Sequence, residues 1–156
     1  GNGLGMDLRR TMEKHSITNM VTLRDVYHCC IMDIHDQQID KEKVEYDFTQ
    51  RPLEEKLEPT IDGLGDNKTN SRVYDFILGL HNPAKYNFTA HKEYNVAKLG
   101  DNYRCLHLLS GAFSSGNKHI GLYFDGAVGD FYELPKSSEL KDQLQMDRYL
   151  KKMRNG

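Results

Sequence analysis

The chain has 156 residues, of which 38% are hydrophobic and 28% charged, and its 21 basic against 23 acidic side chains give a formal net charge of −2. No stretch approaches the roughly 18 consecutive apolar residues of a membrane helix, so a membrane protein is not expected. The near-neutral charge supplies no general excess of cations for nucleic acid phosphates. The length fits a single α+β domain over residues 1–156, in which residues 1–5 have the composition of a cloning remnant.

The cysteines point to a reducing compartment. There are only three, Cys29, Cys30 and Cys105, and the first two are adjacent. An odd number with an adjacent pair does not suit a disulfide framework. We therefore expect an intracellular, cytoplasmic protein, with no cofactor.

The first strong periodic pattern lies between residues 22 and 34. Its apolar residues follow the i, i+3, i+4, i+7 spacing of one helix face and predict a core helix: Leu23, Val26, Tyr27, Cys30, Ile31 and Ile34. The β-favouring composition of residues 26–31 leaves a strand as the alternative. The alternation of apolar and acidic residues over 44–48 predicts a short strand.

Residues 49–71 form a long connecting segment rich in turn formers, with Pro52 and Pro59 discouraging a continuous helix. A loop of this length is uncommon unless it has a function or contains a short helix, for which 53–57 is the place. After it, the apolar residues of 73–80 repeat the helical spacing and predict a second core helix.

From about residue 92 to 134 the turn residues are spaced as in hairpins. Four strands are predicted, over 94–99, 103–109, 119–124 and 130–134, in an antiparallel meander. Pro135 then ends the sheet, and a C-terminal helix over 138–153 is expected to pack on it. N-terminal helices, a meander and a terminal helix define an α+β fold.

Cys105 and His107 share one face of a predicted strand, because side chains repeat every two residues. His107, or His119 on the next strand, could serve as the base that activates the Cys105 thiol. The competing interpretation is that Cys105 is a buried core residue.

The sequence also contains residues suited to metal binding and to nucleic acid binding. The group of His28, Cys29, Cys30 and His35 lacks the second ligand block that zinc sites show, so no metal site is predicted. An aromatic sheet face could stack bases of single-stranded nucleic acid, with candidate contacts at Tyr103, Arg104, Lys118 and Tyr123.

Charge is unevenly distributed along the chain. Residues 136–156 contain six basic and three acidic side chains, a net +3, so the remainder carries −5. The terminal helix could therefore meet an acidic protein surface through Lys141, Arg148, Lys151 and Lys152.

These patterns favour a non-enzymatic protein–protein interaction or regulatory domain, part of a larger assembly. The alternatives are a cysteine-dependent hydrolase or transferase centred on Cys105 and a single-stranded nucleic-acid-binding module that uses the sheet face.

Overall fold

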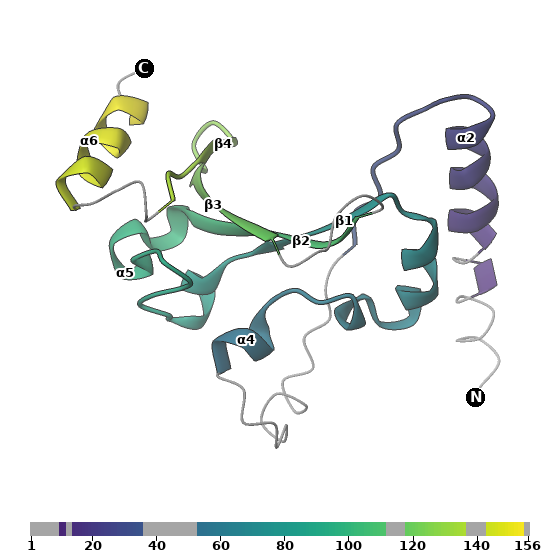
Figure 1. The fold of residues 1–156 in the computed structure, drawn as a ribbon, viewed down its shortest axis with the longest axis horizontal. Helices are drawn as coiled ribbons and strands as arrows, with labels where there is room; N and C mark the ends of the chain where they lie inside the picture. The colour runs from purple at the N-terminus through teal and green to yellow at the C-terminus, as the bar shows by residue number, and fades with distance from the viewer. Residues whose placement is uncertain (1–9, 12–13, 36–52, 112–117, 137–142, 155–156) are drawn as a thin grey trace. The chain divides into compact units, whose positions relative to one another are not determined.

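The fold is α+β, as the sequence predicts: an N-terminal helix, a four-strand antiparallel meander and a C-terminal helix (Figure 1). It is seen in a computed structural model that describes residues 10–11, 14–35, 53–111, 118–136 and 143–154. Strands that are consecutive in the chain are neighbours in the sheet, in the order β1-β2-β3-β4. The chain divides into two compact units, unit 1 with residues 1–79 and 108–117 and unit 2 with residues 80–107 and 118–156.

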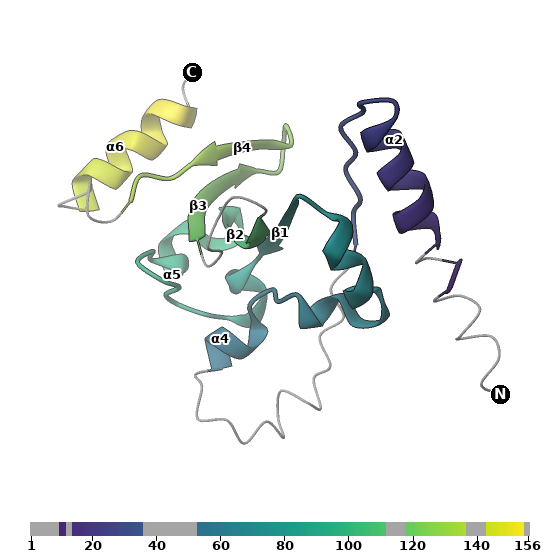
Figure 2. The same cartoon turned by 45° about the vertical axis from the view of Figure 1, so that its right-hand side comes forward.

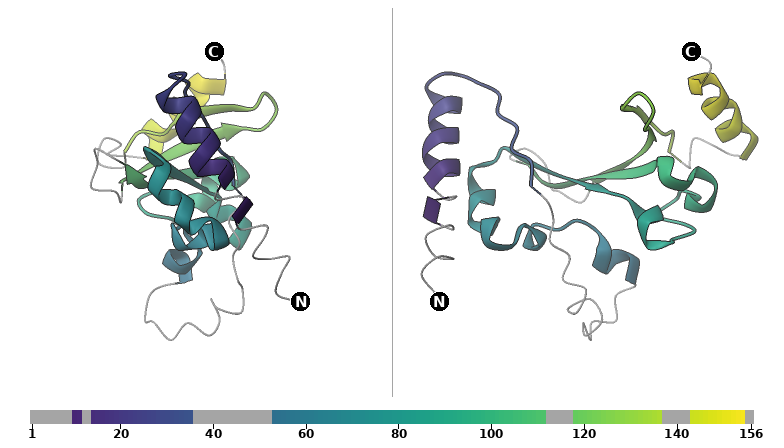
Figure 3. Two further views of the ribbon diagram at one scale, coloured as in Figure 1. Left: turned by 90° about the vertical axis from the view of Figure 1, so that its right-hand side faces the viewer. Right: turned by 180° about the vertical axis from the view of Figure 1, so that it is seen from behind.

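The N-terminal helix of unit 1 is shorter than predicted. A π-helical segment, His15–Met20, continues into α2, Val21–Asp25, and the chain then reverses and runs back beside the helix (Figure 3). His28 has a φ of 54°, a left-handed conformation that cannot continue an α-helix. The predicted core helix over 22–34 is therefore wrong beyond Asp25. Its apolar face is exposed rather than buried, Cys30 included, except for the half-buried Ile31.

The connecting segment contains a short helix, which was one of the two alternatives predicted for it. Helix α4, Leu53–Leu57, buries Leu57, and a 3-10 helix, Asp62–Val73, follows. The expected strand over 44–48 lies outside the described residues. Within the described part of the chain, no helix is long and apolar enough to cross a membrane.

The predicted second core helix over 73–80 is wrong, because this segment forms strand β1, Phe76–His81. Its residues alternate strictly between exposed and buried, with Ile77, Gly79 and His81 on the buried face. Gly79 allows close packing, since a Cβ there would overlap the Pro59 side chain. The prediction of a helix was wrong because a strand that carries large apolar residues on both faces can show the same spacing as one face of a helix.

The first predicted strand of the meander, 94–99, is also wrong. Helix α5, Val96–Leu99, occupies this position, and its N-cap Asn95 accepts a hydrogen bond from the Lys98 backbone N–H over 3.0 Å. An Asn cap satisfies one of the free N–H groups of the first turn, which favours helix over strand here. The meander therefore takes its first strand from β1.

The other three strands form where the sequence predicts them. They are β2, Tyr103–Gly111, β3, Lys118–Asp125, and β4, Asp130–Glu133. β3 and β4 pair antiparallel, with Phe124 opposite Phe131 and their ring centroids 4.6 Å apart. Gly129, with a φ of 77°, closes the turn between these strands.

The core of unit 2 takes its residues mainly from β2 and α5, and the last helix, α6, Gln143–Arg154, packs against it. The course of these elements can be followed in Figure 2. Tyr149 and Leu150 of α6 pack against the core, and the Tyr149 hydroxyl donates to the Glu133 carbonyl over 2.5 Å. An ion pair between Lys98 of α5 and Asp147 adds a second attachment. The predicted packing of the terminal helix is confirmed. The buried core residues are Tyr94, Val96, Leu99, Tyr103, Cys105 and Leu134.

Gly121 of β3 provides a test of this packing. A Cβ at Gly121 would lie 2.5 Å from Tyr94 Cζ, whereas a Cβ at Gly126 in the next turn would meet nothing closer than 3.5 Å. We expect Gly121→Ala to lower the free energy of unfolding by about 1–3 kcal/mol, because Tyr94 has to move within a packed core. Urea unfolding of Gly121→Ala and of Gly126→Ala, the matched control, measures the difference. Equal stability of the two variants would contradict this description of the core.

Candidate functional site

The buried face of β2 carries the chemistry-bearing residues. Tyr103 and Cys105 are 0% exposed and His107 is 8% exposed, while the intervening Arg104 and Leu106 are half-buried. This alternation follows from the two-residue repeat of a strand, which places residues 103, 105 and 107 on the face that covers the core.

His91 is brought to this face by a tight turn. The backbones of His91 and Tyr94 exchange two hydrogen bonds, His91 N–H to Tyr94 O at 3.1 Å and Tyr94 N–H to His91 O at 3.0 Å. Lys92 completes the turn with a φ of 51°. The Tyr94 side chain is anchored in the core, so the turn holds His91, itself only 3% exposed, against β2.

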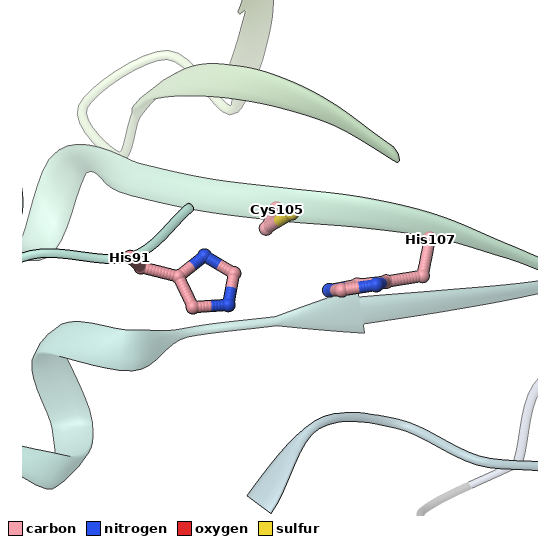
Figure 4. Close-up of side chains that lie close together, drawn as sticks. All are labelled: His91, Cys105 and His107. Carbon is pink, nitrogen blue, oxygen red and sulfur yellow. The ribbon is translucent and has the colours of Figure 1, made fainter. Parts of the chain in front are cut away.

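His91, Cys105 and His107 form a compact cluster. The ring of His91 points toward that of His107, and Cys105 lies between them along β2 (Figure 4). One nitrogen of each histidine and the Cys105 sulfur all lie within 4.8 Å of one another. Among the described residues this is the one group of three histidine, cysteine or acidic side chains close enough to hold a metal ion.

Tyr103 orients His91. Its hydroxyl lies 3.2 Å from Nδ1 of His91, and both side chains are buried. Burial raises the pKa of Tyr103, and the neighbouring Cys105 raises it further. Tyr103 therefore stays protonated and neutral. When its oxygen accepts the Nδ1–H of His91, the lone pair of His91 lies on Nε2.

Two further imidazoles adjoin the cluster. The His81 ring on β1, 4% exposed, lies 5.3 Å from that of His91 and 6.2 Å from that of His107, between ring centroids. The His119 ring on β3 lies 6.3 Å from that of His107 and carries a Glu93 contact at 3.3 Å. Four of the seven histidines of the chain thus gather in unit 2.

The structure brings together part of the site considered for cysteine catalysis. Cys105 and His107 share one face of β2, as predicted, and His119 lies beyond His107 on the neighbouring strand. Cys105 is fully buried, which agrees with the competing interpretation that it is a core residue.

The residues considered for nucleic acid binding are not on one accessible face. Tyr103 is fully buried, and the Arg104 guanidinium lies over the Phe124 ring, 5.2 Å from its centroid, and donates to the backbone carbonyl of Asp101. Lys118 is exposed and Tyr123 half-buried.

The N-terminal candidate ligands lie in unit 1. His28, Cys29 and Cys30 are exposed, whereas His35 contacts Asp33 at 2.9 Å. On α6, Arg148, Lys151 and Lys152 are exposed, and Lys141 lies outside the described residues.

His81 and His91 are the residues that sequence reasoning missed. His81 directly follows the segment over 73–80 that was predicted to be a helix, and His91 lies in a turn outside any motif. The available signal was compositional, since four histidines and a lone cysteine occur between residues 81 and 119.

Comparison with protein-family models gave no match, and neither the curated proteins nor the solved structures searched contain a match to this chain. Its function is therefore argued from the residues themselves.

The tyrosines beside the cluster predict instability at alkaline pH. Burial raises the pKa of Tyr94 from 10.0 to about 12, with the Glu93 charge as the next cause. Between pH 10 and 12 the folded state keeps a proton that the unfolded state has lost, so stability falls as pH rises. Each such group contributes up to about 1.4 kcal/mol per pH unit. Tyr94→Phe should make the fall shallower in urea unfolding from pH 9 to about pH 11.

Tyr27→Phe is the control for this measurement. Tyr27 is 67% exposed, so Tyr27→Phe removes a tyrosine hydroxyl that lies outside the core. An unchanged slope in Tyr94→Phe would show that the Tyr94 hydroxyl is not protected by the fold.

Proposed function

We propose that this chain is a non-enzymatic protein-interaction domain of a larger assembly, and that residues 26–34 of unit 1 are its main contact segment. The observation that supports this is the exposure of large apolar side chains there, 64% for Val26, 67% for Tyr27, 85% for Met32 and 83% for Ile34. Single exposed apolar residues are ordinary, but a contiguous group is typical of an interaction surface.

The polar side chains of this region support the same proposal, because they hold the segment in place. Arg24 donates to the Val73 carbonyl over 2.8 Å, and the Tyr74 hydroxyl donates to Asp33 over 2.7 Å. His35 also contacts Asp33. These contacts of the segment with residues 73 and 74 are polar, while its side chains Val26, Tyr27, Met32 and Ile34 are exposed. These apolar side chains would therefore contribute hydrophobic free energy only when a partner covers them.

The basic side of α6 is a second contact surface in this proposal. Tyr149 and Leu150 pack on unit 2, whereas Arg148, Lys151 and Lys152 are exposed on the same helix. These three cations would meet an acidic surface of the partner and speed its association more than they would strengthen binding.

The two alternative functions have less support. A substrate carbonyl has to reach the sulfur of a catalytic cysteine, and Cys105 has no exposed surface. Base stacking needs an open aromatic face, and Tyr103 is buried.

The apolar segment is tested by a double substitution, Val26→Ser with Ile34→Ser. Each apolar side chain buried at an interface contributes about 1.5–3 kcal/mol, so affinity for the partner should fall about tenfold or more per residue. Tagged wild-type and variant chains are compared by affinity capture with mass spectrometry, and the dissociation constant of a captured protein is then measured by calorimetry.

Val128→Ser is the matched control, because Val128 is 66% exposed on the β3–β4 turn. It should retain the partner. Arg148→Glu with Lys151→Glu should instead slow association in a salt-dependent manner. Retention of the same protein by Val26→Ser, Ile34→Ser at wild-type affinity would overturn the assignment of this segment.

A further inference from the structure

The His91, Cys105 and His107 cluster of unit 2 is independent of the interaction surface and has its own chemistry. Imidazole nitrogen and thiolate sulfur are the ligands that zinc and similar borderline metal ions prefer. Carboxylates, the ligands of magnesium and calcium, are absent from this group.

The distances suit a single ion. The three donor atoms lie within 4.8 Å of one another. With Zn–N of 2.0–2.1 Å and Zn–S of 2.3 Å, the nitrogen and sulfur donors of a tetrahedral zinc with one thiolate lie about 3.3–3.6 Å apart. Side-chain rotations that move each donor by about 1 Å or less would therefore close the set around one ion.

The backbone already holds the ligands at converging positions. Cys105 and His107 are alternate residues of β2, and the His91 turn is fixed by its two backbone hydrogen bonds to Tyr94. The Tyr103 hydroxyl on Nδ1 of His91 leaves Nε2 as the metal-binding nitrogen. A partner on the second ring nitrogen is the usual support of a histidine ligand.

His81 supplies a third imidazole. Its nitrogens are not among the donor atoms within 4.8 Å of one another, but its ring lies against both histidines of the cluster. The rings of His81, His91 and His107 have centroids 5.3, 6.0 and 6.2 Å apart, and imidazoles on one tetrahedral zinc are expected at about 5 Å. Their planes are mutually inclined by 54°, 67° and 69°. Inclined rings can direct nitrogens at a common point, which parallel stacked rings cannot. Tyr86, stacked on His81 at 5.8 Å, keeps this ring in place.

We propose that His91, Cys105 and His107 bind one zinc-class divalent metal ion, with His81 as the fourth ligand, and that this ion stabilises unit 2. All four side chains are buried, with exposures between 0% and 8%. Four protein ligands without access for solvent define a structural site rather than a catalytic one, which keeps an open position for water. The metal joins β1, the His91 turn and β2, so its binding free energy contributes to folding.

The experiment uses the full chain carrying Cys29→Ser and Cys30→Ser, so that Cys105 is its one thiol. This removes the exposed cysteine pair as a competing zinc site. After treatment with a chelator, the chain is titrated with ZnCl2 by calorimetry and with CoCl2 by absorption spectroscopy. We expect one equivalent of each metal, a thiolate-to-cobalt charge-transfer band from Cys105, and a rise in the melting temperature with zinc.

Substitutions identify the ligands. His91→Ala and Cys105→Ser should weaken zinc binding more than about 100-fold, and Tyr103→Phe about tenfold, as loss of an outer hydrogen bond usually does. His81→Ala should weaken binding and change the cobalt spectrum. His119→Ala is the matched control, since its ring adjoins that of His107, whereas the His81 ring adjoins those of both His91 and His107.

A variant that does not fold would also lose metal binding. The cobalt band avoids this ambiguity because it is measured in the parent chain, where it reports on Cys105 directly. A folded parent chain that binds neither zinc nor cobalt, or that binds cobalt without a thiolate band, overturns the site. Wild-type affinity in His81→Ala together with loss in His91→Ala overturns His81 as a ligand and leaves a three-ligand site.

Discussion

The alternation of β2 is the constraint on which unit 2 depends. Tyr103, Cys105 and His107 occupy three successive positions on one face, and this face is covered by the His91 turn and the core residues around Tyr94. A shift of β2 by one residue would expose all three side chains and bury Arg104 instead. The tightness of Gly121 against Tyr94 opposes such a shift, because no larger residue fits at this point of β3.

The core of unit 2 and the segment after α2 in unit 1 differ in how far their apolar side chains are buried. In unit 2, Tyr94, Val96 and Leu134 form a closed core onto which α6 docks through Tyr149. In unit 1, the segment after α2 is held by polar contacts and leaves Met32 and Ile34 outside. The exposed apolar side chains of this segment are the reason why the proposed interaction surface is placed in unit 1.

The wrong secondary-structure predictions share one physical cause. Apolar spacing tells which residues seek burial, but a short segment often satisfies both the helical and the strand period. Over 73–80 the deciding factor is pairing within the sheet, and over 94–99 it is the Asn95 cap. Between 26 and 34 the left-handed turn at His28 ends the helix before its apolar face can be used. The β3–β4 hairpin was predictable because its turn carries glycine and aspartate at the required places.

The sequence by itself determined the α+β class, strands β2 to β4, the docking of the terminal helix and the shared face of Cys105 and His107. These features depend on local turn chemistry and on the two-residue repeat, which are properties of neighbouring residues. Only the tertiary structure decided that β1 joins the sheet and that a turn of the chain carries His91 to Cys105. Both bring together residues distant in the chain, and such contacts are set by packing, which no local pattern encodes.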